Sequence, residues 1–342
     1  MNHLNHSSVL VSHTEFVLLG FPGILDHRKL LAIPFLFIYV TILAGNSLII
    51  YRIGVENSLH SPMYFFITVL FAVNVSCTTS VIPKLILGLS FGMNQISLGG
   101  CLVQMFYIYF LAIFESGLIL SMALDRYVAI CRPLRYNDIM TKNMLVQLVL
   151  IGMVRSFVLA SPMVILASRV QYCRSNVILN FVCENMGLLS LACGDITPHK
   201  IVGLSVRVLV TGVDVSLLLL SYSSILYTAM KIVIGKARGK ALHTCGTHLL
   251  VAMVLYMSAL SSSVLYRMDT IIAYNVQNLF NAIYLMIPAT VNPFIYGLGV
   301  KEIRRCLIKS LRKKKANLPP SVSIHANRTF AHQITAEGAG DK

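Results

Sequence analysis

The chain has 342 residues, 56% of them hydrophobic and only 12% charged, and its mean hydropathy is +0.74. Soluble domains are about 45–50% apolar and about 25% charged, so this composition excludes an ordinary soluble globular protein. The formal net charge of +15 would suit a nucleic-acid-binding protein, but the positions of the cations, described below, indicate a membrane protein instead.

Seven segments are long and apolar enough to cross a bilayer, which takes roughly 20 helical residues. They lie near residues 30–53, 62–84, 98–130, 144–167, 200–231, 241–266 and 274–298. The third, fourth and fifth segments also contain ionisable residues, namely Glu115, Arg155, Arg207 and Asp214. The sequence therefore predicts an all-α membrane protein, a seven-transmembrane helix bundle.

Cations concentrate in alternate connections between these segments. On one side of the membrane lie Arg52, Arg132, Arg135, Lys142, Lys231, Lys236, Arg238, Lys240 and the cations between 301 and 315. The opposite connections hold fewer cations, nearly matched by acidic residues. The positive-inside rule then places the N-terminus outside the cell and the C-terminus in the cytoplasm, and seven crossings require the same reversal.

Three further regions flank the membrane domain, residues 30–298. Residues 1–29 form a polar outer tail without the basic and apolar regions of a signal peptide, so we expect the first span to direct insertion. Residues 299–315 combine apolar residues on one face with cations opposite, which predicts a short amphipathic basic helix on the inner leaflet. Its charge suits anionic lipid better than nucleic acid. Residues 316–342 are polar, and we expect this cytoplasmic tail to be disordered.

The cysteines divide between the two sides of the membrane. Cys101, Cys173, Cys183 and Cys193 lie on the outer, oxidising side, where disulfides form. These four allow three pairings, and the sequence alone does not choose among them. Asn5, in an Asn-His-Ser sequon on the outer tail, is a candidate glycosylation site.

One charged triplet, Asp125-Arg126-Tyr127, lies where the third apolar segment meets a basic stretch. Charge at the edge of a membrane helix is expensive, so Arg126, with Asp125 able to neutralise it, is a candidate functional residue. The alternative is that Arg126 is an anchor whose long side chain reaches toward the lipid headgroups.

Six motifs carry a family resemblance. In chain order they are Gly45-Asn46, LHSPMYFF (59–66), MALDRYVAICRPLRY (122–136), Ser221-Tyr222, KALHTCGTH (240–248) and PATVNPFIYGL (288–298). Together they resemble the odorant receptors of the rhodopsin-like, G-protein-coupled superfamily, over nearly the whole chain from Phe16 to about Leu311. The strings LACGDITPHKIVGL and VTGVDVSLLLLSY, with Glu115-Ser116, resemble the class I, or fish-like, branch.

The resemblance implies a plasma-membrane receptor that binds a small volatile or water-soluble odorant in the outer half of the bundle. It implies activation of a stimulatory, olfactory-type heterotrimeric G protein, which raises cyclic AMP. No enzyme activity and no cofactor are expected. The resemblance also implies the disulfides Cys101–Cys183 and Cys173–Cys193.

The same resemblance gives a switch at the cytoplasmic end. Asp125 holds Arg126 at rest, and outward movement of the sixth helix exposes Arg126 to the G protein. Tyr222 and Tyr296 are expected to bridge to Arg126 through water, although both could be interfacial aromatic anchors. Pro293, after Asn292, breaks the helical hydrogen-bond ladder and allows a bend. His248 is expected at the G-protein contact, or alternatively as an ordinary helix residue.

A ligand pocket is expected between the third, fifth, sixth and seventh helices, under the second outer loop. The residues implied are Met105, Ile108, Tyr109, Ala112, Val206, Val210, Tyr256, Ala259, Leu260 and Ser263. Such an apolar pocket binds small lipophilic molecules. The alternative is that some of these residues only pack the helices together.

Two arginines lead to a more specific hypothesis. Arg207 lies in the outer third of the fifth helix and Arg267 at the outer end of the sixth. A guanidinium facing a dry pocket can bind a carboxylate through two hydrogen bonds, which favours an anionic odorant such as a carboxylic acid. Alternatively, the Arg207 side chain extends outward to the membrane surface or pairs with Glu184 or Asp195, and Arg267 pairs with Asp269.

One departure from the family concerns sodium. Relatives usually carry an aspartate at the position of Asn74, opposite the acid that matches Glu115, and two buried carboxylates would call for a cation. Because only Glu115 remains here, we expect weaker sodium binding or a Glu115 kept neutral by burial.

Other classes of protein fit less well. A non-nasal chemoreceptor on the same scaffold would share every feature above. A membrane transporter would often show internal repeats, which we do not find. A membrane enzyme is disfavoured because no HExxH, GxSxG or nucleotide-binding glycine motif occurs.

Overall fold

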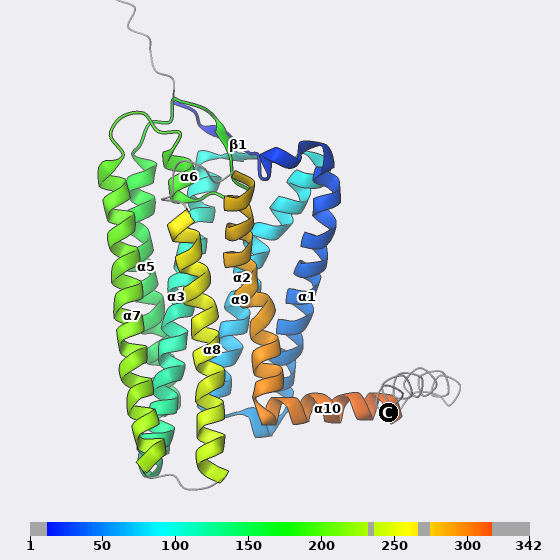
Figure 1. Ribbon diagram of the computed structural model, residues 1–342, viewed down its shortest axis with the longest axis vertical. Helices are drawn as coiled ribbons and strands as arrows, with labels where there is room; N and C mark the ends of the chain where they lie inside the picture. Colours follow the sequence, from blue (N-terminus) through cyan, green and yellow to red (C-terminus); the bar gives the residue numbers. More distant parts are fainter. Residues whose placement is uncertain (1–11, 232–235, 266–273, 317–342) are drawn as a thin grey trace, which may run out of the picture.

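The computed structural model describes residues 12–231, 236–265 and 274–316. Seven long helices run side by side as a bundle (Figure 1). They are α1 (Arg28–Val55), α2 (Pro62–Phe91), α3 (Leu98–Cys131), α5 (Lys142–Ser168), α7 (Thr197–Lys231), α8 (Lys236–Leu265) and α9 (Tyr274–Gly299). The protein is thus an all-α membrane protein with the architecture that the hydropathy pattern predicted.

The sixth crossing, α8, differs from the others in composition. Within the described residues, six helices are long and apolar enough to span a bilayer, whereas the apolar part of α8 is the shorter stretch Cys245–Leu260. The reason lies in the sequence, because α8 begins with the polar and basic string KARGK. The helix therefore extends beyond its apolar stretch at that end.

The outer surface of the bundle is suited to lipid rather than water. Phe37 of α1 is 74% exposed, Leu220 of α7 66% and Val154 of α5 63%. An apolar surface this continuous is rare on a soluble monomer. In lipid it is favourable, because each helix satisfies its own backbone hydrogen bonds. The central helix is α3, which contacts α2, α5, α7 and α8.

A small sheet closes one end of the bundle, called here the sheet end. It contains β1 (Glu15–Leu18), β2 (Gln95–Ser97) and β3 (Val177–Ile178), in the order β2-β1-β3. β1 is antiparallel to β2 and parallel to β3. This sheet could not be predicted from the sequence, because strands of two to four residues are too short to show an alternation of polar and apolar residues. Phe16 and Leu18 are buried there beside Tyr172.

Short helices complete the connections. These are η1 (Pro22–His27), η2 (Asn57–Leu59), η3 (Pro133–Arg135), α4 (Tyr136–Ile139) and α6 (Asn185–Leu189). α10 (Lys301–Ala316) runs across the opposite end, the α10 end, at a large angle to the bundle (Figure 1). Its apolar face packs inward through Ile303, which is fully buried, and Leu307, whereas Ile308 remains 43% exposed.

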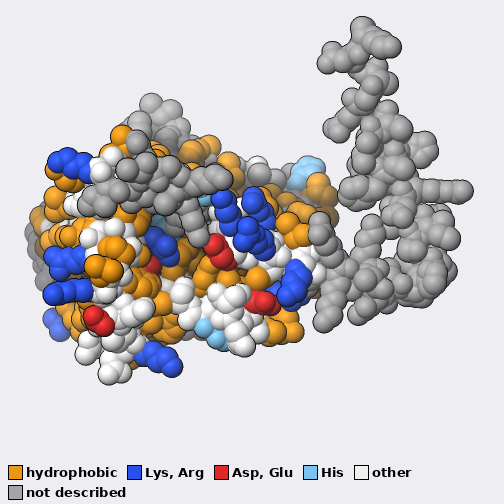
Figure 2. All heavy atoms as spheres, turned by 90° about the horizontal axis from the view of Figure 1, so that it is seen from below, with side chains coloured by type: hydrophobic (Ala, Val, Ile, Leu, Met, Phe, Trp, Pro, Cys, Tyr) orange, Lys and Arg blue, Asp and Glu red, His pale blue; other side chains and the backbone are white. Residues whose placement is uncertain are grey.

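Basic residues gather at the α10 end, as Figure 2 shows in a view from that side. Exposed members include Arg132, Arg135, Lys142, Arg304 and Arg305. The predicted glycosylation site Asn5 lies outside the described residues, as does the predicted disordered tail 316–342 apart from Ala316, the last residue of α10. The predicted division of the chain into four regions stays a prediction.

Candidate functional site

A cavity of about 410 Å³ lies between α3, α5, α7, α8 and α9, near the sheet end. Small-molecule sites typically have volumes of about 300–1,000 Å³. Its walls are mainly apolar, with a few polar groups. Residues that line it include Tyr109, Ala112, Ile113, Ser116, Met163, Glu184, Asn185, Lys200, Leu204, Val206, Arg207, Val210, Thr211, Leu255, Tyr256, Ala259, Leu260 and Tyr284.

The structure brings most of the predicted pocket residues to this cavity. Tyr109 and Ala112 line it from α3, Val206, Arg207 and Val210 from α7, and Tyr256, Ala259 and Leu260 from α8. Met105 and Ile108 are not among the residues that line it. Met105 is fully buried, and Ile108 packs in a cluster with residues of α1, α2 and α9. The side chain of Ser263, and Arg267, lie outside the described residues.

Several lining residues were missed by the sequence analysis. Lys200, Leu204 and Thr211 share the α7 face that carries Arg207, at helical spacings that could have revealed them. Tyr284 lies on α9, for which no pocket residue was predicted. Glu184 and Asn185 come from the loop after α5, and only the tertiary structure places them at the cavity.

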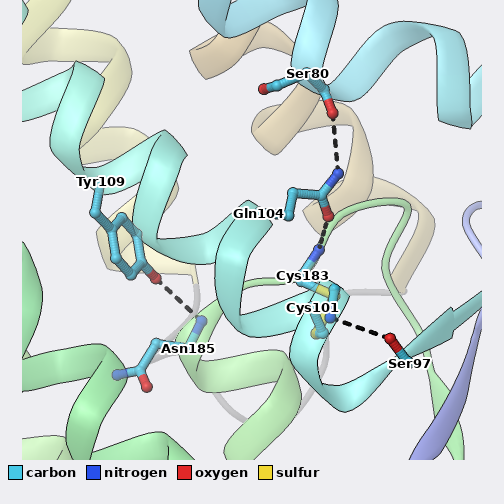
Figure 3. Close-up of a disulfide and its surroundings, with 8 residues drawn as sticks. Ser80, Ser97, Cys101, Gln104, Tyr109, Cys183 and Asn185 are labelled. Carbon is cyan, nitrogen blue, oxygen red and sulfur yellow. Dashed lines mark hydrogen bonds between the residues drawn. A yellow bond between two sulfur atoms is a disulfide. The ribbon is translucent and has the colours of Figure 1, made fainter.

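Three contacts fix this loop against α3, as Figure 3 shows. The disulfide Cys101–Cys183 joins the loop to α3, with a Cα–Cα distance of 5.3 Å. The backbone N–H of Cys183 donates to Gln104 Oε1 at 3.1 Å, and that of Asn185 donates to Tyr109 Oη at 3.0 Å. The loop is therefore held as one wall of the cavity, and Tyr109 both lines the cavity and positions the loop.

The second disulfide lies within the same loop. Cys173 and Cys193 are bonded, with a Cα–Cα distance of 5.7 Å. Tyr172 and Ala192, immediately before them, form an antiparallel bridge. Both pairings implied by the family resemblance are thus present, and both lie toward the sheet end.

Arg207 provides a cation on the cavity wall. Its side chain is half-buried, and its Nη1 donates to the Ala259 carbonyl oxygen at 3.5 Å, a long hydrogen bond. Within the described residues, no ion pair joins Arg207 to Glu184 or Asp195. Asp195 instead accepts the backbone N–H of Thr197 at 2.9 Å, before the start of α7. Hydrogen bonds from Thr197 lower the pKa of Asp195.

A buried ion pair lies beneath the cavity. Arg155 Nη2 on α5 is 2.6 Å from Asp214 Oδ1 on α7, and the Asp214 side chain is fully buried. The hydroxyl of Tyr256, which lines the cavity, lies close to Asp214 and to Ser116. The sequence analysis found no role for Arg155, and the structure shows that it neutralises Asp214.

The Asp-Arg-Tyr triplet lies near the α10 end. Arg126 Nη2 is 3.3 Å from Asp125 Oδ2, and the Arg126 guanidinium also contacts the sulfur of Met63. Tyr136 of α4 donates its hydroxyl to Asp125 Oδ1 at 2.7 Å. Tyr127 packs, partly buried, against the hydrophobic core. Asp125 is thus held by Arg126 on its own helix and by Tyr136 on the connection that follows α3.

The other predicted switch residues line the interior nearby. Tyr296 Oη is 3.2 Å from His248 Nδ1, which joins α9 to α8. Tyr222 is 6% exposed and Tyr296 fully buried, so neither is an interfacial anchor. Asn292 and Pro293 are buried in α9. The described structure shows no direct bond from Arg126 to either tyrosine, and the bridges through water stay a prediction.

The arrangement around Glu115 differs from a two-carboxylate cation site. Asn74 is an amide and turns its Nδ2 toward Asn46 Oδ1, at 3.5 Å. Glu115 is buried, with one oxygen that makes no hydrogen bond in the described structure. Within the described residues, no three acidic, histidine or cysteine side chains are grouped to hold a metal. The residues present do not fit the sodium site implied by the resemblance.

A seven-helix membrane bundle, with a cavity near one end and a charged Asp-Arg-Tyr triplet near the other, has the architecture of a seven-transmembrane receptor. The olfactory receptor family model matches residues 35–314. The chain belongs to the olfactory receptor family, which implies an odorant ligand and G-protein coupling. It is a multi-pass membrane protein and not an enzyme.

Its relatives are of the class I type. The chain is 36% identical to human olfactory receptor 52D1 over 89% of its own length and 96% of the relative's. It is 40% identical to human olfactory receptor 52B6, over 84% of the chain and 85% of the relative. It is 35% identical to olfactory receptor 51E2 of Mus musculus, over 87% of the chain and 93% of the relative.

Proposed function

We propose that this odorant receptor recognises small carboxylic acids through Arg207 and activates a stimulatory heterotrimeric G protein, which raises cyclic AMP. We further propose that it acts at the plasma membrane, with the sheet end outside the cell and α10 on the inner leaflet. The half-buried guanidinium on the wall of an otherwise largely apolar cavity is the observation that supports this proposal most strongly.

A carboxylate suits the chemistry of this wall. Arg207 can present two parallel N–H donors to a carboxylate. The hydroxyls of Tyr109 and Tyr284 and the ammonium of Lys200 belong to the same cavity and supply further donors. The apolar residues of α3 and α8 provide the surface for the hydrocarbon part of the ligand.

G-protein activation requires access to Arg126 at the α10 end. The Tyr296–His248 contact joins α9 to α8 directly above this region. Movement of α8 away from α9 would break that contact and open the space beside Arg126. A ligand that contacts Tyr256, Ala259 or Leu260 touches the opposite part of the same helix, so α8 is the element that would connect ligand and switch.

The test is cyclic-AMP output in cells that express the receptor with a stimulatory G protein. The panel contains short- and medium-chain acids and the matching alcohols, esters and ketones. Arg207→Gln is expected to raise the acid concentration that gives half-maximal cyclic-AMP output by roughly tenfold or more. The reason is that a hydrogen bond between charged groups contributes about 1.5–3 kcal/mol. Arg126→Ala is expected to abolish the response to every ligand.

The matched control is Arg169→Gln, since Arg169 is exposed at the end of α5 and does not line the cavity. All variants are compared at equal surface expression. A response confined to neutral odorants, and equal in wild type and Arg207→Gln, would remove the carboxylate proposal. Signalling without any rise in cyclic AMP would instead remove the stimulatory coupling.

A further inference from the structure

A second, much smaller cavity lies at the sheet end, apart from the ligand cavity. It has a volume of about 20 Å³ and lies between β1, the start of α1, the last turns of α2 and the loop residue Phe181. About 10–15 Å³ of such space holds one water molecule. The cavity therefore accepts one small particle and is too small for sulfate, phosphate or an organic ligand.

Two cations share the wall of this cavity. They are Arg28, the first residue of α1, and Lys84 of α2. The remaining described residues that line it are Leu18, Leu19, Gly20, Leu85, Gly88, Leu89, Asn94 and Phe181, and none of these is acidic. Two like charges at one small cavity repel each other, and an anion between them would remove that repulsion.

Two nitrogen atoms of the Arg28 guanidinium lack a partner within the part of the chain that the structure describes. Its Nε and Nη2 are buried and have no hydrogen-bond partner in the described structure. Leaving a buried charged donor unpaired is costly. Arg28 also stands at the N-terminus of α1, where the helix dipole disfavours a cation and favours an anion.

Lys84 supplies the second cation, on the part of α2 that approaches the sheet end, where its hydrogen bond to Gln95 is exposed. It lies seven residues before the end of α2 at Phe91, or about 10 Å along the helix axis at 1.5 Å per residue. Its ammonium donates to the Gln95 carbonyl oxygen at 2.7 Å, which uses one of three donors and supplies no negative charge.

We propose that this cavity is a site for a single small monovalent anion, chloride in physiological saline. The anion accepts hydrogen bonds from Arg28 and Lys84 and neutralises both. Because β1, α1 and α2 all contribute to the cavity, the bound anion fastens the N-terminal strand to the first two helices. This site is independent of the odorant and of G-protein coupling.

The experiment measures chloride directly, on the full-length receptor in nanodiscs of zwitterionic phosphatidylcholine. The probe is the ³⁵Cl NMR linewidth during a chloride titration at constant ionic strength, with gluconate as the replacement anion. The expected result is a saturable excess linewidth that bromide removes by competition. Arg28→Gln and Lys84→Gln should each weaken chloride binding by roughly tenfold or more, since each removes a charge-assisted contact.

Two controls separate this site from general surface charge. Lys29→Gln removes a cation next to Arg28 that is exposed and does not line the cavity, and it should leave the linewidth unchanged. Arg28→Lys keeps the charge and should retain most of the binding. No excess linewidth in the wild type, or full binding in both Gln variants, would overturn the proposal.

If a Gln variant fails to fold, competition between chloride and other anions on the unmodified receptor still tests the proposed site. Displacement of chloride by bromide but not by sulfate supports a site of this size. Displacement by both anions at matched ionic strength would show a diffuse surface effect and would overturn the proposal.

Discussion

Asp125 has two partners that come from different parts of the chain. Arg126 is its neighbour on α3, and Tyr136 belongs to the short helix α4. Burial and the hydrogen bond to Asp125 raise the pKa of Tyr136, so the phenol remains a neutral donor throughout the physiological pH range. Tyr136 is thus a second restraint on the Asp125 side chain, and as a donor it does not change its protonation near neutral pH.

Replacing Tyr136 by Phe removes this hydrogen bond and keeps the ring. A hydrogen bond to a charged group contributes about 1.5–3 kcal/mol, so Asp125 should hold Arg126 less firmly. We expect Tyr136→Phe to raise agonist-free cyclic-AMP output severalfold at equal surface expression. Tyr51→Phe is the matched control, because Tyr51 is 59% exposed. Basal output equal to or below the wild type would contradict the role assigned to Tyr136.

Single residues also show where the sequence was informative. The pocket residues of α3, α7 and α8 were implied by the family resemblance, and most of them lie at the cavity because residues three or four apart share one face of a helix. Tyr136, although inside the recognised motif, had no predicted role, because its bond to Asp125 depends on how the connection after α3 folds back. Glu184 and Asn185 escaped prediction for the same reason.

Among the helices, α5 and α7 depend on a buried charge pair. Asp214 is fully buried, and the Arg155 side chain is 24% exposed. Loss of one partner from a buried pair costs about 3–5 kcal/mol, because the other charge is left uncompensated.

We therefore expect Arg155→Met to destabilise the receptor strongly. The double variant Arg155→Met/Asp214→Leu should recover most of the loss, because replacing a buried pair by apolar residues is often close to neutral. Thermal unfolding of the purified receptor measures both effects. It is monitored through the labelling of the Cys245 thiol, which is buried in the folded protein. A single variant as stable as the wild type, or a double variant worse than the single, would contradict this account.

The elements themselves were predicted unevenly. All seven spans were found, because about 20 consecutive apolar residues leave little alternative to a membrane helix. The sheet of β1, β2 and β3 was not found, because its strands are held by neighbours distant in sequence rather than by their own pattern. The helix α10 was anticipated from the apolar positions that now place Ile303 in the core.

At the scale of the whole molecule, two independent features give the same orientation. Both disulfides lie toward the sheet end, and disulfides persist in the oxidising space outside the cell. Basic residues gather at the α10 end (Figure 2), and cations are retained on the cytoplasmic side. The position of the disulfides and the position of the cations are independent observations. Their agreement favours a sheet end that faces the outside of the cell.

This orientation predicts which epitope tags antibodies reach in intact cells. A tag before residue 12 should be stained without permeabilisation, and a tag after residue 342 only once the membrane is opened.

A triple variant tests whether the cations cause this orientation. Changing Arg132, Arg135 and Lys142 together to Gln should leave a larger fraction of molecules inverted or poorly inserted, since positive charge near the ends of the spans determines orientation. Staining of the C-terminal tag on intact, unmodified cells would contradict the orientation. An unchanged staining pattern in the triple variant would instead assign the orientation to the cations of α10.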